Sequence, residues 1–162
     1  MIVNNYKLFL EQLKLIDVQS YEWPWFDEGW VTANEYSFRI LVEGNALGSS
    51  NVVIGYSCYR TVPSTSSSSN SNVYLAKLCV RPQYRKQGFG SRLMTDIIQV
   101  AGARKLYTIL HEENKYLSWA KDWGWACTGL ERGLWPDGRD GLLFEFKSIP
   151  TIESINNERS FN

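Results

Sequence analysis

Apolar residues recur at helix or strand spacing along most of the chain. Over residues 5–16 they come every three or four positions, which places them on one face of a helix. That face holds Tyr6, Phe9, Leu10, Leu13 and Ile16. From residue 36 apolar and polar residues alternate, which predicts a strand over 36–42, and a second strand is predicted over 52–60. Because the two strands are close in sequence and glycines separate them, we expect an antiparallel hairpin.

The second half of the chain alternates between strand and helix patterns. Strands are predicted over residues 73–80, 106–111, 126–133 and 141–147. A helix opens at residues 88–90 and ends at Gly102, and a further helix is capped by Asn114 and closed by Gly124. This order of elements predicts an α/β fold with a mixed sheet and no internal repeat.

Three segments follow neither period. Residues 21–30 are rich in aromatics, but Pro24 interrupts them, so we expect a broken helix or an ordered loop whose aromatics are mostly core. Residues 63–72 are almost entirely Ser, Thr and Asn, which predicts a mobile loop. The polar end of the chain is expected to fray. We therefore expect one domain over residues 1–148 and a polar tail over 149–162.

Composition excludes several classes of protein. A chain of 162 residues, 44% of them hydrophobic, can bury one core. Its 17 Lys and Arg balance 17 Asp and Glu, so nothing draws it to nucleic acid or anionic lipid. Without a membrane-length apolar run or a signal-peptide pattern, we expect a soluble cytoplasmic protein with no nucleic-acid or membrane partner. Cys58, Cys79 and Cys127 are too widely spaced for a disulfide framework or structural zinc, so no metal is expected.

A glycine-containing turn over residues 85–91 joins a predicted strand to a predicted helix. The N-terminus of a helix presents unpaired N–H groups and the positive end of the helix dipole, which attract an anion. Gly88 and Gly90 let the backbone approach that anion closely. The turn lacks the Lys-Ser/Thr of a P-loop and the third glycine of a dinucleotide fingerprint, so a different pyrophosphate is indicated. On glycine spacing alone, an ordinary strand-to-helix connection explains the turn equally well.

The turn and its neighbours resemble the GNAT family of acetyl-CoA-dependent N-acetyltransferases. The family signature Arg/Gln-x-x-Gly-x-Gly/Ala is met by Arg85, Gly88 and Gly90. Residues 78–85 are similar to the family's strand before this turn, and residues 114–125 to its Asn…Gly-Phe helix. The resemblance covers about residues 6–148.

Two further segments resemble the protein N-terminal acetyltransferases, especially the bacterial ribosomal-protein alanine acetyltransferases. Residues 23–26, Trp-Pro-Trp-Phe, are similar to their Pro-Trp element, and residues 132–140 to their Arg-x-Tyr-Tyr-Pro…Asp hairpin. This resemblance implies that Trp23, Trp25 and Trp135 flank the acceptor entrance.

The family resemblance also implies a fold, an activity and a set of binding residues. The fold would be a mostly antiparallel sheet with splayed central strands, and the activity acetyl transfer from acetyl-CoA to a primary amine, with a protein N-terminal α-amine favoured. Two alternatives remain open: a small amine such as a polyamine or an antibiotic, and a non-catalytic acyl-CoA-binding module. The residues implied to bind acetyl-CoA are Leu78, Cys79, Val80, Arg85, Lys86, Gln87, Gly88, Phe89, Gly90, Ser91 and Asn114.

The catalytic residues depart from the family pattern. The Glu base of the ribosomal-protein enzymes falls on Ile109, and the general-acid Tyr falls on Ala120 or Lys121. His111 lies on the same strand face as Ile109 and could act as a base through water, although a structural histidine is the stronger interpretation. Tyr74 stands where a eukaryotic subgroup keeps a catalytic Tyr, and is equally explained as a strand aromatic.

Overall fold

The computed structural model describes residues 1–20, 28–44, 51–64, 71–114, 116–135 and 137–147. The chain divides into two units, Met1–Arg104 and Lys105–Asn162. Most of the aromatic segment after residue 20, most of the predicted mobile loop and the polar tail lie outside the described residues, so those three expectations stay predictions. None of the described helices has the length and apolar character needed to cross a bilayer.

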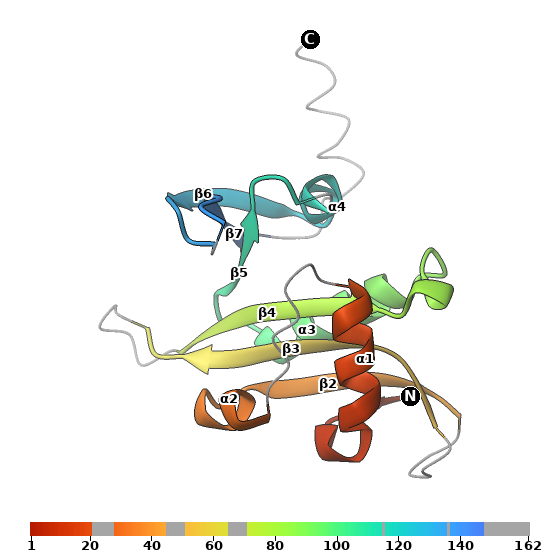
Figure 1. Cartoon of the computed structure of the whole chain (residues 1–162). Coiled ribbons are helices and arrows are strands. Elements are labelled where there is room, and N and C mark those ends of the chain that lie inside the picture. The colour runs from red at the N-terminus through yellow and green to blue at the C-terminus, as the bar shows by residue number, and fades with distance from the viewer. Residues whose placement is uncertain (21–27, 45–50, 65–70, 115, 136, 148–162) are drawn as a thin grey trace. The chain divides into compact units, whose positions relative to one another are not determined.

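The first unit is an antiparallel sheet with helix α1 across one face and helix α3 behind the other (Figure 1). Its strands pair in the order β1 (Ile2–Val3), β2 (Ser37–Glu43), β3 (Val52–Val62) and β4 (Asn72–Val80). Its helices are a 3-10 turn (Tyr6–Phe9), α1 (Leu10–Ser20), α2 (Glu28–Ala33), a second 3-10 turn (Pro82–Tyr84) and α3 (Phe89–Ala101). The pairing of β2 with β3 confirms the predicted hairpin.

The first helix begins and ends later than its apolar pattern predicts. Phe9, Leu13 and Ile16 are buried as expected, but Tyr6–Phe9 form a 3-10 turn, and α1 runs from Leu10 to Ser20 instead of ending at residue 16. The next buried position, Asp17, carries a carboxylate, so a pattern that counts apolar residues does not include it.

Asp17 ends in a buried polar cluster between α1 and the sheet. The Tyr56 hydroxyl of β3 donates to Asp17 Oδ1 at 2.7 Å, and Lys77 Nζ of β4 donates to the same oxygen. All three side chains are buried. Burial lowers the pKa of Lys77, and the hydrogen bond to Asp17 opposes that shift. The cluster therefore ties α1 to the two strands beneath it, and each buried charge has an opposite charge beside it.

Strand β4 contains a bulge at Ala76. Two consecutive residues of β3 pair with Leu75 and Lys77, which leaves Ala76 as the extra residue. A bulge shifts the alternation of side chains by one position. As a result, Tyr74 lies on the same face of the sheet as Lys77, rather than on the opposite face with Leu78.

Helix α3 packs on the other face as predicted. Its buried residues are Leu93, Met94, Ile97 and Ala101, and Gly102 ends it with φ +57°. Arg39 of β2 makes two hydrogen bonds to Asp96, from Nε at 2.7 Å and from Nη2 at 2.6 Å. This paired contact holds the helix in register with the sheet.

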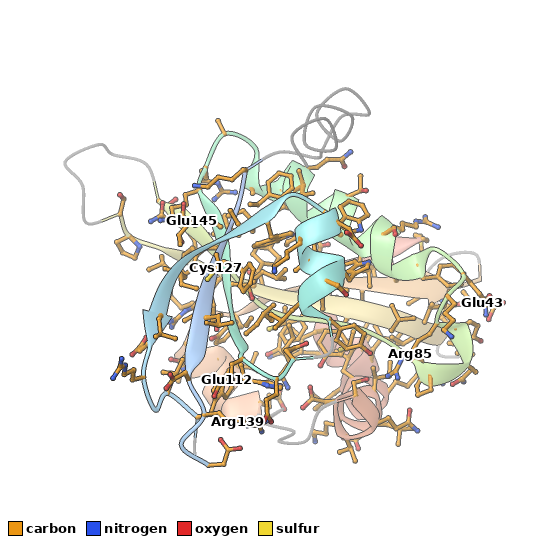
Figure 2. The ribbon with its side chains drawn as sticks, turned by 90° about the horizontal axis from the view of Figure 1, so that it is seen from above. Glu43, Arg85, Glu112, Cys127, Arg139 and Glu145 are labelled. Carbon is orange, nitrogen blue, oxygen red and sulfur yellow. The ribbon has the colours of Figure 1, made fainter. Side chains whose placement is uncertain are left out.

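The second unit is a three-stranded antiparallel sheet with one short helix. Its elements are β5 (Leu106–His111), α4 (Leu117–Asp122), β6 (Trp125–Glu131) and β7 (Gly141–Phe146), and β7 is the central strand. Glu145 lies near the C-terminal end of β7, and Arg139 lies just before the first residue of the strand (Figure 2). The Glu145 carboxylate pairs with Lys105 and Lys147. Hydrogen bonds from these lysines lower the pKa of Glu145 to about 2.

We expect Asp17→Ala to lower the free energy of unfolding by about 3–5 kcal/mol, because it leaves the buried Lys77 ammonium without its carboxylate. The double variant Asp17→Leu/Lys77→Met removes both charges and should cost less than the single change. Urea denaturation of the three proteins measures the difference. A double variant less stable than Asp17→Ala would contradict this account.

Candidate functional site

The turn before α3 is shaped by two residues in the left-handed backbone region. Lys86 has φ +60° and Gly88 has φ +81°. A Cβ placed on Gly88 would meet no protein atom within 4 Å, so the space in front of the helix is open. The first N–H groups of a helix have no acceptor within it, and Gly88 supplies no side-chain cap. The turn thus offers backbone donors and the positive end of the α3 dipole to an anion such as a pyrophosphate.

Arg85, implied by the resemblance to bind the cofactor, contacts the protein itself. Its Nε donates to the Val80 carbonyl at 2.9 Å and its Nη2 to Ser20 Oγ at 3.2 Å (Figure 2). These bonds fasten the end of β4 and the turn to the end of α1. Lys86 is the exposed cation of the turn. Whether Arg85 or Lys86 also contacts a bound cofactor stays a prediction.

Gln12 of α1 supports the same end of the sheet, and no sequence motif singled it out. Its Oε1 accepts from the Val53 N–H at 2.9 Å and from Arg81 Nη2 at 3.1 Å, while its Nε2 donates to the Asn51 carbonyl at 3.0 Å. A lone polar residue on an amphipathic helix gives no sequence signal for such a role, because solvent-facing glutamines are common.

The strand residues expected to pair with the pantetheine arm lie at the end of β4 that leads into this turn. Cys79 is buried, and Leu78 and Val80 are half-buried beside residues of the α3 face. Whether the backbone of these residues pairs with a cofactor stays a prediction.

Tyr74, at the other end of β4, packs on a cation. The Arg60 guanidinium of β3 lies 5.7 Å from the centre of the Tyr74 ring and 5.5 Å from that of Tyr36. The bulge at Ala76 is what turns Tyr74 toward Arg60, so strand alternation alone could not predict this contact.

In the second unit, His111 and Trp135 lie together. Their rings meet edge to face with centroids 6.0 Å apart, and Arg139 Nη1 lies 3.3 Å from His111 Nδ1. A guanidinium only donates hydrogen bonds, so Nδ1 is the acceptor and the ring proton is on Nε2. Whether His111 has a structural role or acts as a base stays a prediction.

The connection from β6 to β7 is built by polar contacts around Arg139. Arg139 Nε pairs with Asp137 Oδ2 at 2.5 Å, and the Trp135 N–H donates to the Arg139 carbonyl at 3.2 Å. Desolvation raises the pKa of Asp137, but hydrogen bonds from Arg139 outweigh that effect, and the pKa lies below its usual value. Trp135 is therefore held in a structured turn. Trp23 and Trp25, the other residues expected at the acceptor entrance, lie outside the described residues.

Ile109, which replaces the family's Glu base, makes apolar contacts. A Cβ on Gly141 would lie 3.0 Å from Ile109 Cγ2 and 2.5 Å from Leu134 Cδ2, so the glycine leaves room for both side chains. The position is half-buried among carbon atoms, and a carboxylate there would lose hydration.

Asn114 shapes the turn before α4 without being the capping residue of the helix. The residue at that cap is Tyr116, and Asn114 Oδ1 accepts from the Tyr116 N–H at 2.9 Å. The Asn114 carbonyl accepts from the Leu117 N–H at 3.0 Å. Its side-chain nitrogen has no acceptor among the described residues, so the predicted hydrogen bond to a cofactor is compatible with this geometry.

Residues 5–123 match the model of a protein family described as the Acetyltransferase (GNAT) family. This match spans more than half of the chain. No curated protein matches the sequence closely enough to count as a relative.

Solved structures of acetyltransferases share the fold at low sequence identity. Arabidopsis thaliana NAA60 in complex with acetyl-CoA is 18% identical, with a TM-score of 0.73 over 90% of this chain and 99% of that chain. The Escherichia coli ribosomal-protein-S18-alanine N-acetyltransferase is 18% identical, with a TM-score of 0.69 over 94% and 96%. Chaetomium thermophilum Naa20 in complex with a bisubstrate analogue is 14% identical, with a TM-score of 0.72 over 98% and 90%. These likenesses confirm the predicted α/β fold with a mostly antiparallel sheet.

We expect His111→Ala to lower the free energy of unfolding by about 1–2 kcal/mol, because the hydrogen bond from Arg139 and the contact with Trp135 are lost. His111→Asn keeps an acceptor near Nδ1 and should be milder. Both variants should keep kcat/KM for acetyl transfer within about fivefold of wild type and leave its pH profile unchanged. A loss on the order of 10²-fold in both, together with loss of an inflection in the histidine range, would identify His111 as the base.

Proposed function

The chain belongs to the GNAT family of acetyltransferases, and on that basis we propose that it transfers an acetyl group from acetyl-CoA to the N-terminal α-amine of a polypeptide. The observation that carries the cofactor half of this proposal is the open turn before α3, with Gly88 at φ +81° and no atom in front of it. The α-amine is supported by likeness to N-terminal acetyltransferases and by the hairpin around Trp135.

The pyrophosphate of acetyl-CoA would lie against the N–H groups at the start of α3, where Gly90 lets the backbone approach it. The pantetheine arm would pair with the backbone of Leu78, Cys79 and Val80. A backbone N–H of that strand would donate to the thioester oxygen as negative charge develops on it. The family resemblance implies that the Asn114 side chain hydrogen-bonds the cofactor.

The transfer itself requires a neutral amine. Its nitrogen attacks the thioester carbonyl, the C–S bond breaks, CoA leaves as the thiolate, and the excess proton passes to water. The carboxylate and phenol that assist this step elsewhere in the family are replaced here by Ile109 and by Ala120 or Lys121. With ordinary pKa values of about 7.8 for an α-amine and about 10.4 for lysine, roughly a quarter of the former but only about a thousandth of the latter is neutral at pH ~7.4. A site without a strong base therefore favours the α-amine.

Gly88→Val should weaken CoA binding by at least about tenfold, because a branched side chain disfavours φ +81° and occupies the open space. Lys86→Ala removes one exposed, screened charge and should cost about threefold or less. Gly102→Val is the matched control, since Gly102 also has positive φ but lies at the other end of α3. It should strain the helix comparably and leave CoA affinity within about twofold. Isothermal calorimetry measures all four proteins, and unchanged affinity in Gly88→Val would remove the cofactor assignment.

A peptide that carries both a free N-terminus and an internal lysine should be acetylated faster at the N-terminus at neutral pH. Mass spectrometry of the digested product locates the acetyl group, and the same peptide with a blocked N-terminus serves as the control. Equal or faster modification of the lysine would contradict the preference for the α-amine. If CoA binds but no amine is acetylated, the chain is a binding module rather than an enzyme.

A further inference from the structure

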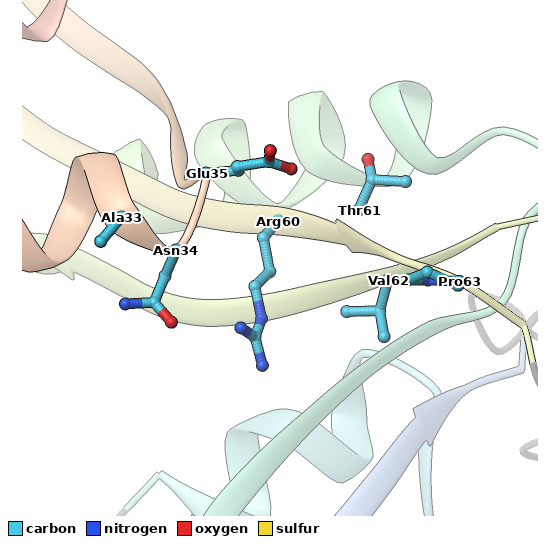
Figure 3. A pocket seen from close by; sticks show the side chains of 7 residues that line it. All are labelled: Ala33, Asn34, Glu35, Arg60, Thr61, Val62 and Pro63. Carbon is cyan, nitrogen blue, oxygen red and sulfur yellow. The ribbon is translucent and has the colours of Figure 1, made fainter.

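A pocket of about 300 Å³ opens in the first unit between the end of α2 and the outer half of β3 (Figure 3). Its charged residues are Arg60 and Glu35, and Asn34 adds an amide. Figure 3 shows the Arg60 and Asn34 side chains extending to the same side, while the Glu35 carboxylate extends away from them. On this side of the pocket, the polar groups are therefore the guanidinium of Arg60 and the amide of Asn34.

The Arg60 guanidinium is held in place by aromatic rings rather than by an acidic partner. It lies 5.5 Å from the Tyr36 ring centre and 5.7 Å from that of Tyr74. Its Nε is buried, and none of its nitrogens has a hydrogen-bond acceptor among the described residues. Cation–π contacts stabilise the positive charge of the guanidinium and orient its plane. They do not use its N–H groups as hydrogen-bond donors.

Arg60 differs in this respect from every other half-buried arginine of the described chain. Each of the others donates a hydrogen bond to a described oxygen: Arg39, Arg81, Arg85, Arg104 and Arg139. A half-buried guanidinium without a protein oxygen partner keeps its outer N–H groups for water or for a ligand.

The backbone around α2 keeps the nearest carboxylate away from Arg60. The Tyr36 N–H donates to the Val31 carbonyl at 3.1 Å and the Glu35 N–H to the Thr32 carbonyl at 3.2 Å, the two bonds of a Schellman motif. Glu35 occupies the left-handed position of that motif, with φ +55°, where glycine is usual. The motif places the Tyr36 ring on Arg60 and directs the Glu35 side chain elsewhere.

We propose that Arg60 binds a carboxylate of the acceptor, so that the enzyme prefers peptides with an acidic side chain at the second or third position. This inference rests on the proposed function. A carboxylate matches the planar guanidinium, which can donate two parallel N–H···O hydrogen bonds to it. The held orientation of Arg60 reduces the entropy lost when the anion binds.

The position of Arg60 along the sheet favours a peptide over a small amino acid. Arg60 pairs with Tyr74, four residues before Leu78 on β4, which corresponds to about 10–13 Å of strand. The acetyl group would be held near Leu78. An extended peptide advances about 3.3–3.6 Å per residue, so the side chain of its second or third residue can reach Arg60. The carboxylate of a free amino acid is too close to its own amine.

The test compares two pairs of peptides. One pair has Asp or Asn at the second position, and the other pair has Glu or Gln at the third position. The two peptides of a pair are otherwise identical. For wild type, we expect kcat/KM at least about tenfold higher for one acidic peptide than for its amide counterpart, with the preference falling as salt is raised. In Arg60→Met the ratio should fall to about one. In Arg60→Lys, which keeps the charge and loses the fork, it should be intermediate.

Arg104→Met is the matched control, because Arg104 is a half-buried arginine that donates only to backbone carbonyls at the end of α3. It should leave the acidic-to-amide ratio unchanged. Calorimetry of the same peptides with wild type supplies a readout that needs neither catalysis nor a folded variant. Equal or weaker binding of both acidic peptides would overturn the role of Arg60. Failure to acetylate any peptide, with acidic peptides still binding more tightly, would overturn the proposed function and leave the carboxylate site standing.

Discussion

The buried carboxylate of Asp17 is the contact on which the first unit depends. One oxygen receives the Tyr56 hydroxyl and the Lys77 ammonium, so a single residue of α1 holds both β3 and β4. Because the pair is buried, it tolerates little displacement, and any shift of α1 would leave a charge without its partner. Near its two ends α1 makes further contacts, from Gln12 to Val53 of β3 and from Ser20 to Arg85.

The bulge in β4 is the second constraint, and it divides the strand into two segments whose side chains alternate in opposite phase. Toward the turn, Leu78 keeps the regular alternation and packs with the α3 face. Beyond Ala76 the alternation is reversed, and Tyr74 faces Arg60. One extra residue in the strand thus separates a segment suited to cofactor pairing from a segment suited to contact with an acceptor.

The arginines show how one residue type serves different purposes. Arg39 holds α3 on the sheet through Asp96, and Arg85 fastens the turn before α3 to α1. Arg139 orders the hairpin and sets the tautomer of His111. Arg60 has aromatic neighbours and no oxygen partner among the described residues, which fits a group that completes its contacts with a ligand. The role of each arginine therefore depends on which oxygen atom accepts from its guanidinium in the folded chain, and the residue type alone does not indicate that role.

Periodicity and turn chemistry predicted strands β2 to β7, α3 and the glycine turn, because each depends on residues close together in the chain. The alternation around Phe38, the apolar face around Leu93 and the punctuation at Gly88 are all local signals. The contacts of Asp17, Arg60 and the imidazole of the second unit join residues far apart in sequence, and no local pattern encodes them. Tertiary packing alone decided which polar residues are buried in pairs, where the bulge reverses β4, and which guanidinium lacks a partner, since each depends on the register between strands and on the helices packed against them.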